Sequence, residues 1–361
     1  MSTATSHAAQ SLRILRRISG RALCFDAKGA LYISRHLRIL QSIDDAQSWQ
    51  EIARLPNPGI RKAAELTRLT TRLLRHEIRA LTVLPNGGLV ACDRRGVYFG
   101  SRGQTELLPS RVEVPAGQSI APPMTLTTGP NGEVLWGEYK SARGHRQPIH
   151  VFASRDAGRS FQVAHVFEGG QIRHVHNIIH DATLGKYWIL AGDHEHEPGI
   201  GLLDSDFGGF EWVVKGQQRY RAVELFDFGD HIIYGTDTEK EPNAVMRLDK
   251  SDGRVERLAE LDGSCIYACR FGSIYALSTS IEPSEVNRCR EAGLWLSTDG
   301  SDWQRVLGAR KDRWNETYFQ FGSLVLPRGA SPNSTIHFSG QAVCDYDGRV
   351  ITVEPVGFNA G

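Results

Sequence analysis

The residues best suited to chemistry lie between positions 171 and 197, in the stretch QIRHVHNIIHDATLGKYWILAGDHEHE. This stretch holds five of the 13 histidines of the chain, together with Arg173 and Asp193. Histidine exchanges protons near neutral pH and also binds divalent metals, so the stretch could serve acid–base catalysis or metal binding. The same histidines could also be satisfied structural residues, and all three interpretations stay open at this point.

The elements that would position these histidines are two antiparallel strands joined by the turn DATLGK. In such a hairpin, His174 and His176 begin the first strand and His194 and His196 follow the second, so these four share one end. His180 belongs to the opposite end. The run DHEHE lacks a tight ligand signature and is typical of a solvated loop. We therefore expect no resident cofactor, with a divalent metal at His174, His176 and His194 as the alternative.

Three short segments along the chain repeat one turn pattern. They are SIDDAQSW at residues 42–49, SRDAGRSF at residues 154–161 and STDGSDW at residues 297–303. Each segment follows a short apolar strand and precedes another, which is typical of a hairpin. The aspartate can accept hydrogen bonds from turn N–H groups, and glycine supplies the positive φ that such turns require.

These segments resemble the box of the Asp-box, or BNR-repeat, family of sialidase-like β-propellers, which reads S-x-D-x-G-x-[ST]-[WF]. Residues 154–161 fit the box fully, and residues 42–49 fit it except that Ala46 replaces glycine. The resemblance covers most of the chain. It implies a propeller in which the boxes are structural turns far from the active face.

Strand-rich units recur at about 40 to 55 residues, the spacing of four-stranded propeller blades. We predict an all-β, seven-bladed β-propeller that forms a single domain over residues 1–361. The segment SLRILRRIS is expected to pair with the last blade and close the ring. Residues 1–10 are expected to be a disordered tail. Residues 61–77 are expected to form a helical insertion between blades one and two, with Leu66, Leu69 and Leu73 on one side. The blades are predicted to begin near residues 20, 78, 123, 173, 220, 266 and 320.

The repeat also predicts which ends of the strands share a face. If strands A to D run from the axis outward and the box turns join C to D, the D-to-A and B-to-C connections lie on the opposite face. We call that end of the central channel the mouth. Four blades begin there with an arginine at one repeat position: Arg21, Arg79, Arg173 and Arg221. Guanidinium groups suit carboxylates, so these residues predict an anion site, although each could instead bond a neighbouring blade.

The candidate site consists of residues at the mouth whose side chains can exchange protons or bind a carboxylate. The predicted catalytic residues are His174, His176, Tyr139, Glu138 and Asp193. The predicted substrate-binding residues are Arg79, Arg173, Arg221, Asp237 and Glu282.

This residue set predicts an enzyme that acts on an acidic glycan. Polysaccharide lyases built on seven-bladed propellers look similar, since they use His, Tyr and Arg to remove the C5 proton of a uronate and eliminate the leaving oxygen. Two alternatives stay open: a glycoside hydrolase with paired carboxylates, and a non-catalytic propeller that binds a glycan or a protein. The chain departs from sialidases in its blade number and in lacking their early R-I-P motif, so sialic acid is not the expected substrate.

Composition narrows the partners further. Lys and Arg total 42 and Asp and Glu total 41, which argues against a protein that coats nucleic acid. No apolar run is long enough for a signal-peptide core or a membrane span, so we expect a cytoplasmic protein. The six cysteines include no CxxC and are expected to be reduced and mostly buried. The oligomeric state stays open.

Overall fold

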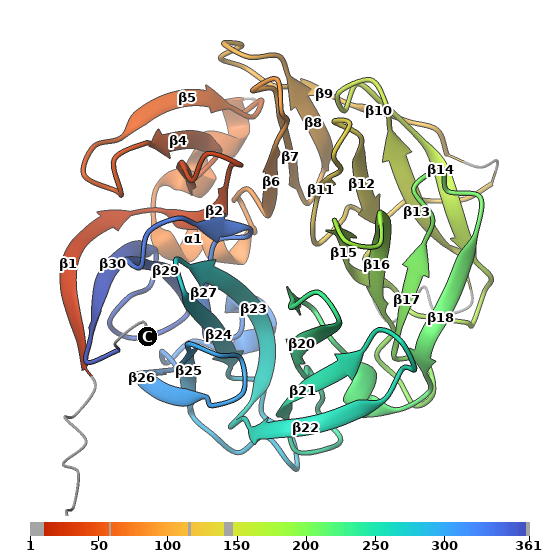
Figure 1. Ribbon diagram of the computed structural model, residues 1–361. Coiled ribbons are helices and arrows are strands. Elements are labelled where there is room, and N and C mark those ends of the chain that lie inside the picture. Colours follow the sequence, from red (N-terminus) through yellow and green to blue (C-terminus); the bar gives the residue numbers. More distant parts are fainter. Residues whose placement is uncertain (1–10, 58, 115–116, 141–146, 359–361) are drawn as a thin grey trace, which may run out of the picture.

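The computed structural model describes residues 11–57, 59–114, 117–140 and 147–358, and it shows seven β-sheets arranged around a central axis (Figure 1). The all-β, seven-bladed prediction is confirmed. The predicted tail at residues 1–10 lies outside the described residues. Within the described part of the chain, no helix has the length and apolar character needed to cross a membrane.

The first three blades are built from the following strands. Blade one contains β2 (Arg21–Phe25), β3 (Leu31–Arg35), β4 (Arg38–Ser42) and β5 (Gln50–Arg54). Blade two contains β6 (Ala80–Val83), β7 (Leu89–Asp93), β8 (Gly96–Gly100) and β9 (Leu108–Pro109). Blade three contains β11 (Thr127–Thr128), β12 (Val134–Gly137), β13 (Ile149–Ser154) and β14 (Ser160–Phe167), with β10 (Arg111–Val112) added in parallel at its outer edge.

The remaining four blades repeat the same order. Blade four contains β15 (Val175–Asp181), β16 (Lys186–Ala191), β17 (Gly199–Leu203) and β18 (Phe210–Lys215). Blade five contains β19 (Phe226–Asp227), β20 (His231–Gly235), β21 (Ala244–Asp249) and β22 (Val255–Glu260). Blade six contains β23 (Ser264–Phe271), β24 (Ile274–Ser280), β25 (Glu291–Ser297) and β26 (Gln304–Arg310), with β28 (Ala330–Ser331) in parallel. Blade seven contains β27 (Ser323–Val325), β29 (Ile336–Gln341), β30 (Arg349–Val356) and β1 (Ser11–Ser19).

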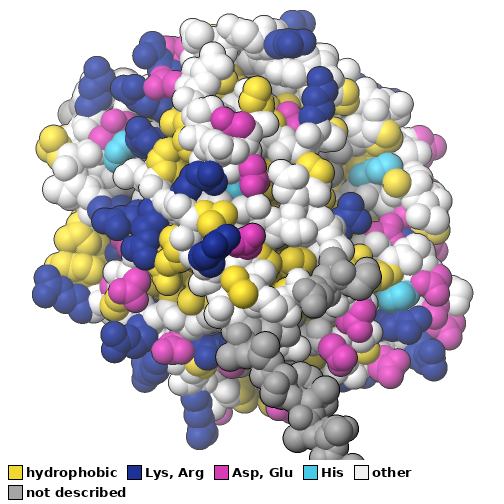
Figure 2. All heavy atoms as spheres, turned by 60° about the vertical axis from the view of Figure 1, so that its left-hand side comes forward, with side chains coloured by type: hydrophobic (Ala, Val, Ile, Leu, Met, Phe, Trp, Pro, Cys, Tyr) yellow, Lys and Arg dark blue, Asp and Glu magenta, His cyan; other side chains and the backbone are white. Residues whose placement is uncertain are grey.

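Blade seven joins the two ends of the described chain, as predicted. The N-terminal strand β1 pairs antiparallel with β30 along its whole length, from Ser11 opposite Val356 to Ser19 opposite Arg349. This pairing closes the ring by joining the N-terminal strand to the last blade. On this side of the molecule, charged side chains of both signs alternate with apolar ones, in line with the near-neutral net charge (Figure 2).

Apolar side chains from facing blades form the core. Between blades two and three, Val90 and Cys92 pack with Trp136, Phe152 and Phe161, and all five are buried. The rings of Trp136 and Phe152 stack with centroids 4.4 Å apart. Phe161 is the last residue of a box segment, so the box aromatic helps to fasten one blade to the next.

The box turns form as predicted. Asp156 accepts hydrogen bonds from the amide and hydroxyl of Ser160 at 2.9 and 2.6 Å, and Gly158 N–H donates to Ser154 Oγ at 2.9 Å. In the first box, Ala46 takes the glycine position with a φ of 63°. The Ala46 N–H donates to Ser42 Oγ at 2.9 Å, so the turn forms with alanine at the glycine position.

The insertion between blades one and two is helical, as predicted, and it is divided into two short helices. The structure has a 3-10 helix η1 (Gly59–Glu65) and a short α1 (Arg68–Leu73). Thr67 caps α1 by accepting from the Thr70 amide, and this cap starts a new helix at that point. Leu66 and Leu73 are 78% and 48% exposed, so the predicted leucine side does not face the core.

The cysteines agree with the expected reduced thiols. All six are free, and Cys24, Cys92, Cys265 and Cys269 are buried.

Candidate functional site

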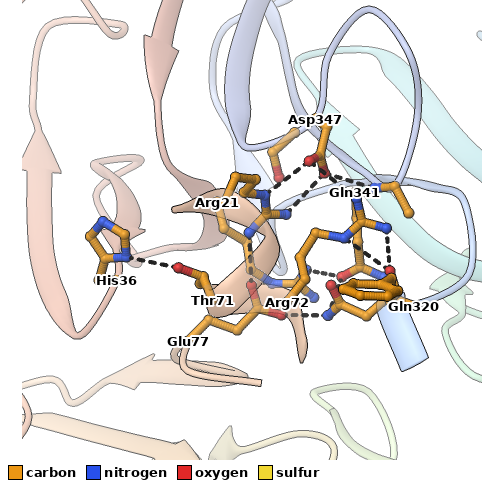
Figure 3. A network of polar contacts seen from close by, with 12 residues as sticks. Arg21, His36, Thr71, Arg72, Glu77, Gln320, Gln341 and Asp347 are labelled. Carbon is orange, nitrogen blue, oxygen red and sulfur yellow. Dashed lines mark hydrogen bonds and ion pairs between the residues drawn. The ribbon is translucent and has the colours of Figure 1, made fainter. Parts of the chain in front are cut away.

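The insertion is fastened to blade seven and to the segment before it by ion pairs of Arg68 and Arg72 (Figure 3). Arg68 binds the carboxylate of Asp347 through two nitrogens, at 3.1 and 3.0 Å. Arg72 is only 1% exposed, lies 2.5 Å from Asp312 Oδ2, and donates to the Phe319 carbonyl at 2.9 Å. Arg72 is a buried charge, and removing the partner of such a charge costs about 3–5 kcal/mol, so its contacts fix the chain that leads into β6.

The residues after α1 bring charge to the mouth. Glu77 accepts a hydrogen bond from Gln320 Nε2 at 2.6 Å, and its Oε2 lies 3.6 Å from Arg68 Nη1 (Figure 3). Arg21 also donates to Gln341 Oε1 at 2.6 Å. Burial would raise the pKa of Glu77, but Arg21 and Arg68 hold it below its ordinary value. The mouth therefore contains an ionised carboxylate next to the first of the four repeated arginines.

Blade four contributes a group that we call the His–Asp cluster: His174, His176 and Asp193. Nε2 of His176 lies 2.9 Å from Nε2 of His174 and 2.9 Å from Oδ1 of Asp193, and Nε2 of His174 lies 3.2 Å from Oδ2. All three residues are buried, and the atoms that could bind a metal lie within 4.8 Å of one another. The β15–β16 register shifts between Val175 and Asn177, so His176 occupies a β-bulge. This arrangement can hold a metal ion or share a proton.

The charges within this cluster follow from its surroundings. Burial lowers the pKa of His174, despite the opposing contact with Asp193. Burial would raise the pKa of Asp193, but its contacts with His174 and His176 lower it well below the ordinary value. The cluster therefore combines an ionised carboxylate with a neutral His174 imidazole.

Two of the repeated arginines contact Asp193. Arg173 Nη1 lies 3.4 Å from Asp193 Oδ2 and 2.6 Å from His194 Nε2. Arg221 Nε lies 3.1 Å from Asp193 Oδ1, and its Nη2 lies 3.4 Å from Asp237 Oδ2. Burial would lower the pKa of Arg221, but Asp237 and Asp193 raise it above its usual value. Arg221 therefore stays charged and links blade four to blade five, whereas the contacts of Arg173 lie within blade four.

Tyr139 and Glu282 are the more accessible members of the site. Tyr139 is 36% exposed, and its ring stacks on His174 with centroids 4.0 Å apart. Partial burial raises the pKa of Tyr139, and Asp193 and Asp237 add to this effect, so the phenol stays protonated. Burial and nearby Asp237 raise the pKa of Glu282 to about 8, against the influence of Arg221. Asp237 is itself buried, which raises its pKa.

A second group of arginines lies beside blade two: Arg75, Arg79 and Arg94. Burial lowers the pKa of Arg75, and repulsion from Arg94, Arg72 and Arg79 acts in the same direction against the attraction of Glu77. Of the carboxylates that the structure describes, none lies within ion-pair distance of Arg75, Arg79 or Arg94. We call these three residues the arginine group, and its positive charge is incompletely neutralised.

Blade three connects the arginine group to the His–Asp cluster. Arg79 Nη1 donates to the Pro123 carbonyl at 3.2 Å, and Pro123 forms an isolated antiparallel bridge with Glu138. Tyr139 is the next residue in the chain, and its ring covers His174. The arginine group and the His–Asp cluster are therefore neighbours at the mouth.

The structure does not bring Glu138 into the site. Its carboxylate is fully buried, accepts from the Ala121 and His150 amides at 2.9 Å, and contacts His150 Nδ1 at 2.7 Å and Lys140 Nζ at 3.2 Å. All of these contacts are structural, since they tie β12 to β13. His196 is likewise apart from the cluster, with Nδ1 3.1 Å from the Gly216 carbonyl.

Sequence reasoning missed the residues that cross the channel below the mouth. Arg328 of blade seven lies 2.7 Å from Glu224 Oε1 and donates to Asn177 Oδ1 at 2.9 Å. Burial raises the pKa of Glu224, although Arg328 opposes this. The sequence signal for this contact was Arg328 itself, a charged residue at the end of the apolar segment SLVLPRG. Arg75 was also missed, because it belongs to the insertion and not to the repeat.

Comparisons with known proteins show the fold and leave the family open. No family model and no curated protein matches the sequence. A solved oligogalacturonate lyase in complex with manganese is 10% identical, with a TM-score of 0.60 over 98% of each chain. A GH74 xyloglucanase from Xanthomonas campestris is 13% identical, with a TM-score of 0.58 over 92% of this chain and 52% of its own, so this chain spans about half its length. A chain of a mitotic checkpoint complex is 9% identical, with a TM-score of 0.58 over 95% of this chain and 94% of its own. The resemblance to Asp-box sialidases therefore finds no support in family or sequence matches.

Proposed function

We propose that this protein cleaves an acidic, uronate-containing glycan by β-elimination. One observation carries the proposal: the incompletely neutralised arginine group adjoins the Tyr139, Glu282 and Arg221 side of the mouth. A chain of acidic sugars needs both parts, because one binds the neighbouring carboxylate and the other acts on the reacting ring.

The reaction assigns a role to three groups at the mouth: Arg221, Glu282 and Tyr139. Arg221 neutralises the uronate carboxylate, which acidifies the C5–H bond. Glu282 takes the C5 proton, the C4–O bond breaks, and a C4–C5 double bond forms. Tyr139, kept protonated by its surroundings, donates its proton to the departing oxygen. Acid or base assistance of this kind contributes about 10²–10⁴-fold in rate.

The two histidines take a different role from the one expected from the sequence. His174 and His176 are each 2% exposed, and their Nε2 atoms face each other and Asp193. Neither nitrogen is directed at an incoming sugar without rearrangement, so we assign them to holding the cluster and not to proton abstraction.

The structural comparisons support a glycan as the ligand only in a general way. Two of the similar folds are named for polysaccharide or oligosaccharide cleavage, and one of these is a lyase whose whole chain corresponds to this one. The checkpoint complex shows that the same fold also serves proteins named for quite different assemblies.

Hydrolysis is the second candidate, because one specific observation favours it. Glu282, with its pKa raised to about 8, would be protonated at neutral pH and could act as a general acid. The ionised carboxylate of Asp193 would then complete the pair that glycosidases use.

Incubation of the full-length protein with a panel of uronate oligosaccharides tests both candidates. We expect a rise in ultraviolet absorbance from the unsaturated product, together with new reducing ends. New reducing ends without the absorbance would replace the lyase with the hydrolase. If neither signal appears, both enzymatic functions are rejected, and a binding assay with the same oligosaccharides would then identify a non-catalytic propeller.

Variants test the assigned residues. Tyr139→Phe and Glu282→Gln should lose activity, while His180→Ala, from the far end of β15, should keep it.

A further inference from the structure

We propose that His174, His176 and Asp193 form a site for one divalent transition-metal cation of the manganese, iron or zinc type. The inference rests on the geometry of these three side chains and does not depend on the reaction proposed above.

The hydrogen bonds on the far side of each imidazole fix its tautomer. Nδ1 of His174 lies 3.1 Å from the Lys140 carbonyl, and Nδ1 of His176 lies 2.9 Å from the Ala222 carbonyl. A carbonyl oxygen can only accept, so both Nδ1 atoms carry the hydrogen. In the neutral rings, each Nε2 therefore presents a lone pair. Backbone carbonyls that hold Nδ1–H in this way are the usual outer partners of metal-binding histidines.

These lone pairs converge on one another and on a carboxylate. The two Nε2 atoms are 2.9 Å apart, and the Asp193 oxygens lie 2.9 and 3.2 Å from them. Four acceptor atoms at such distances repel one another unless a metal cation or a shared proton lies between them. Metal–ligand bonds of about 2.1 Å at right angles place neighbouring ligands about 3.0 Å apart, which agrees with these separations.

The surroundings hold the carboxylate in place. Glu197 Oε2 accepts from the amides of Arg173, Asp193 and His194, at 3.1, 3.2 and 3.3 Å. Gln218 Nε2 donates to the Asp193 carbonyl at 3.0 Å. Glu197 and Gln218 therefore hold the loop that carries Asp193 in place, as expected for a pre-formed site.

The chemistry of the three ligands indicates which cation the cluster suits. Two imidazoles and one carboxylate suit manganese, iron or zinc, whereas magnesium and calcium prefer oxygen ligands throughout. Three protein ligands leave positions open for water or a substrate oxygen, the usual arrangement of a catalytic metal site.

Metal titration of the full-length protein tests the site without any glycan. After treatment with a chelator, we expect the protein to bind one equivalent of Mn²⁺ or Zn²⁺ by calorimetry, at least tenfold more tightly than Mg²⁺. His176→Ala and Asp193→Asn should lose this binding, and His180→Ala should retain it. Absence of Mn²⁺ and Zn²⁺ binding by folded wild type would overturn the proposal, as would unchanged binding by folded His176→Ala.

A spectroscopic measurement covers variants that fail to fold. Co²⁺ added to the stripped wild-type protein should give visible absorption bands typical of nitrogen and oxygen ligation, and Zn²⁺ should abolish them by competition. No such bands would again reject the site. Because neither measurement involves a sugar, a negative result leaves the proposed glycan reaction standing, and a failed glycan assay leaves the metal site standing.

Discussion

Arg221 of blade five lies 3.1 Å from Asp193 of blade four, and the same guanidinium lies 3.4 Å from Asp237 of its own blade. One side chain thus joins two blades and two buried carboxylates directly at the mouth. Replacement of Arg221 by alanine should lower the free energy of unfolding by about 3–5 kcal/mol, because it removes the guanidinium that contacts two buried carboxylates. Urea denaturation measures this. A loss below about 1 kcal/mol would show that the ion pairs are weaker than their burial implies.

Glu282 should make the protein less stable as the pH rises. Its carboxyl has a pKa of about 8 in the folded state, above its ordinary value. Between the unfolded and folded pKa values the native state binds more protons, so the free energy of unfolding falls with increasing pH over that range. Glu282→Gln should remove this trend and stabilise the protein at pH 9 relative to wild type, by on the order of a few kcal/mol. Denaturant unfolding of both proteins at pH 5 and pH 9 checks this, and parallel pH profiles would contradict it.

Activity should show the opposite dependence on Glu282. If Glu282 removes the C5 proton, the ionised form is the active one, so the rate should rise as the pH climbs through about 8. Glu282→Gln should reduce the rate by about 10²-fold or more. The measurement is the pH profile of kcat on a uronate oligosaccharide. A rate that falls through the same pH range would favour the protonated carboxyl, and with it hydrolysis.

Arg94 should contribute to the affinity for acidic glycans with little effect on stability. It is exposed, and it repels Arg75 instead of pairing with a described carboxylate. Arg94→Ala should raise KM about tenfold, the equivalent of about 1.4 kcal/mol, while the melting temperature stays within error. Lys28→Ala is the matched control, since Lys28 is equally exposed but lies in the A-to-B turn of blade one, on the opposite face. Equal effects of the two variants would show that net charge alone attracts the ligand.

Asp156 should matter for stability and not for ligand binding. It accepts bonds from the amide and hydroxyl of Ser160 and from the hydroxyl of Ser154, on the face away from the mouth. Asp156→Ala should cost about 0.5–1.5 kcal/mol, because the turn loses the hydrogen bonds that Asp156 accepts. Thermal unfolding and glycan affinity, measured on the same sample, separate the two effects. A change in affinity at unaltered stability would place the box turns nearer to the ligand than the fold does.

The regular parts of this protein follow from the sequence alone. Residues 154–161 specify their turn through contacts within eight consecutive residues, so the box is visible without a fold. The spacing of such turns then sets the number of blades, and SLRILRRIS was assigned to the last blade because a propeller must close. Local hydrogen bonds and a fixed repeat are short-range properties, and short-range properties can be predicted from the order of residues.

The make-up of the site was decided by tertiary structure. The sequence suggested His194 as the third partner of His174 and His176, but a bulge at His176 and the braced loop after β16 bring Asp193 there instead. Glu138 lies beside Tyr139 in the chain, yet its carboxylate turns into the sheet toward His150. A one-residue change of register reverses the direction of every following side chain, and only the packed blades determine where such a change occurs.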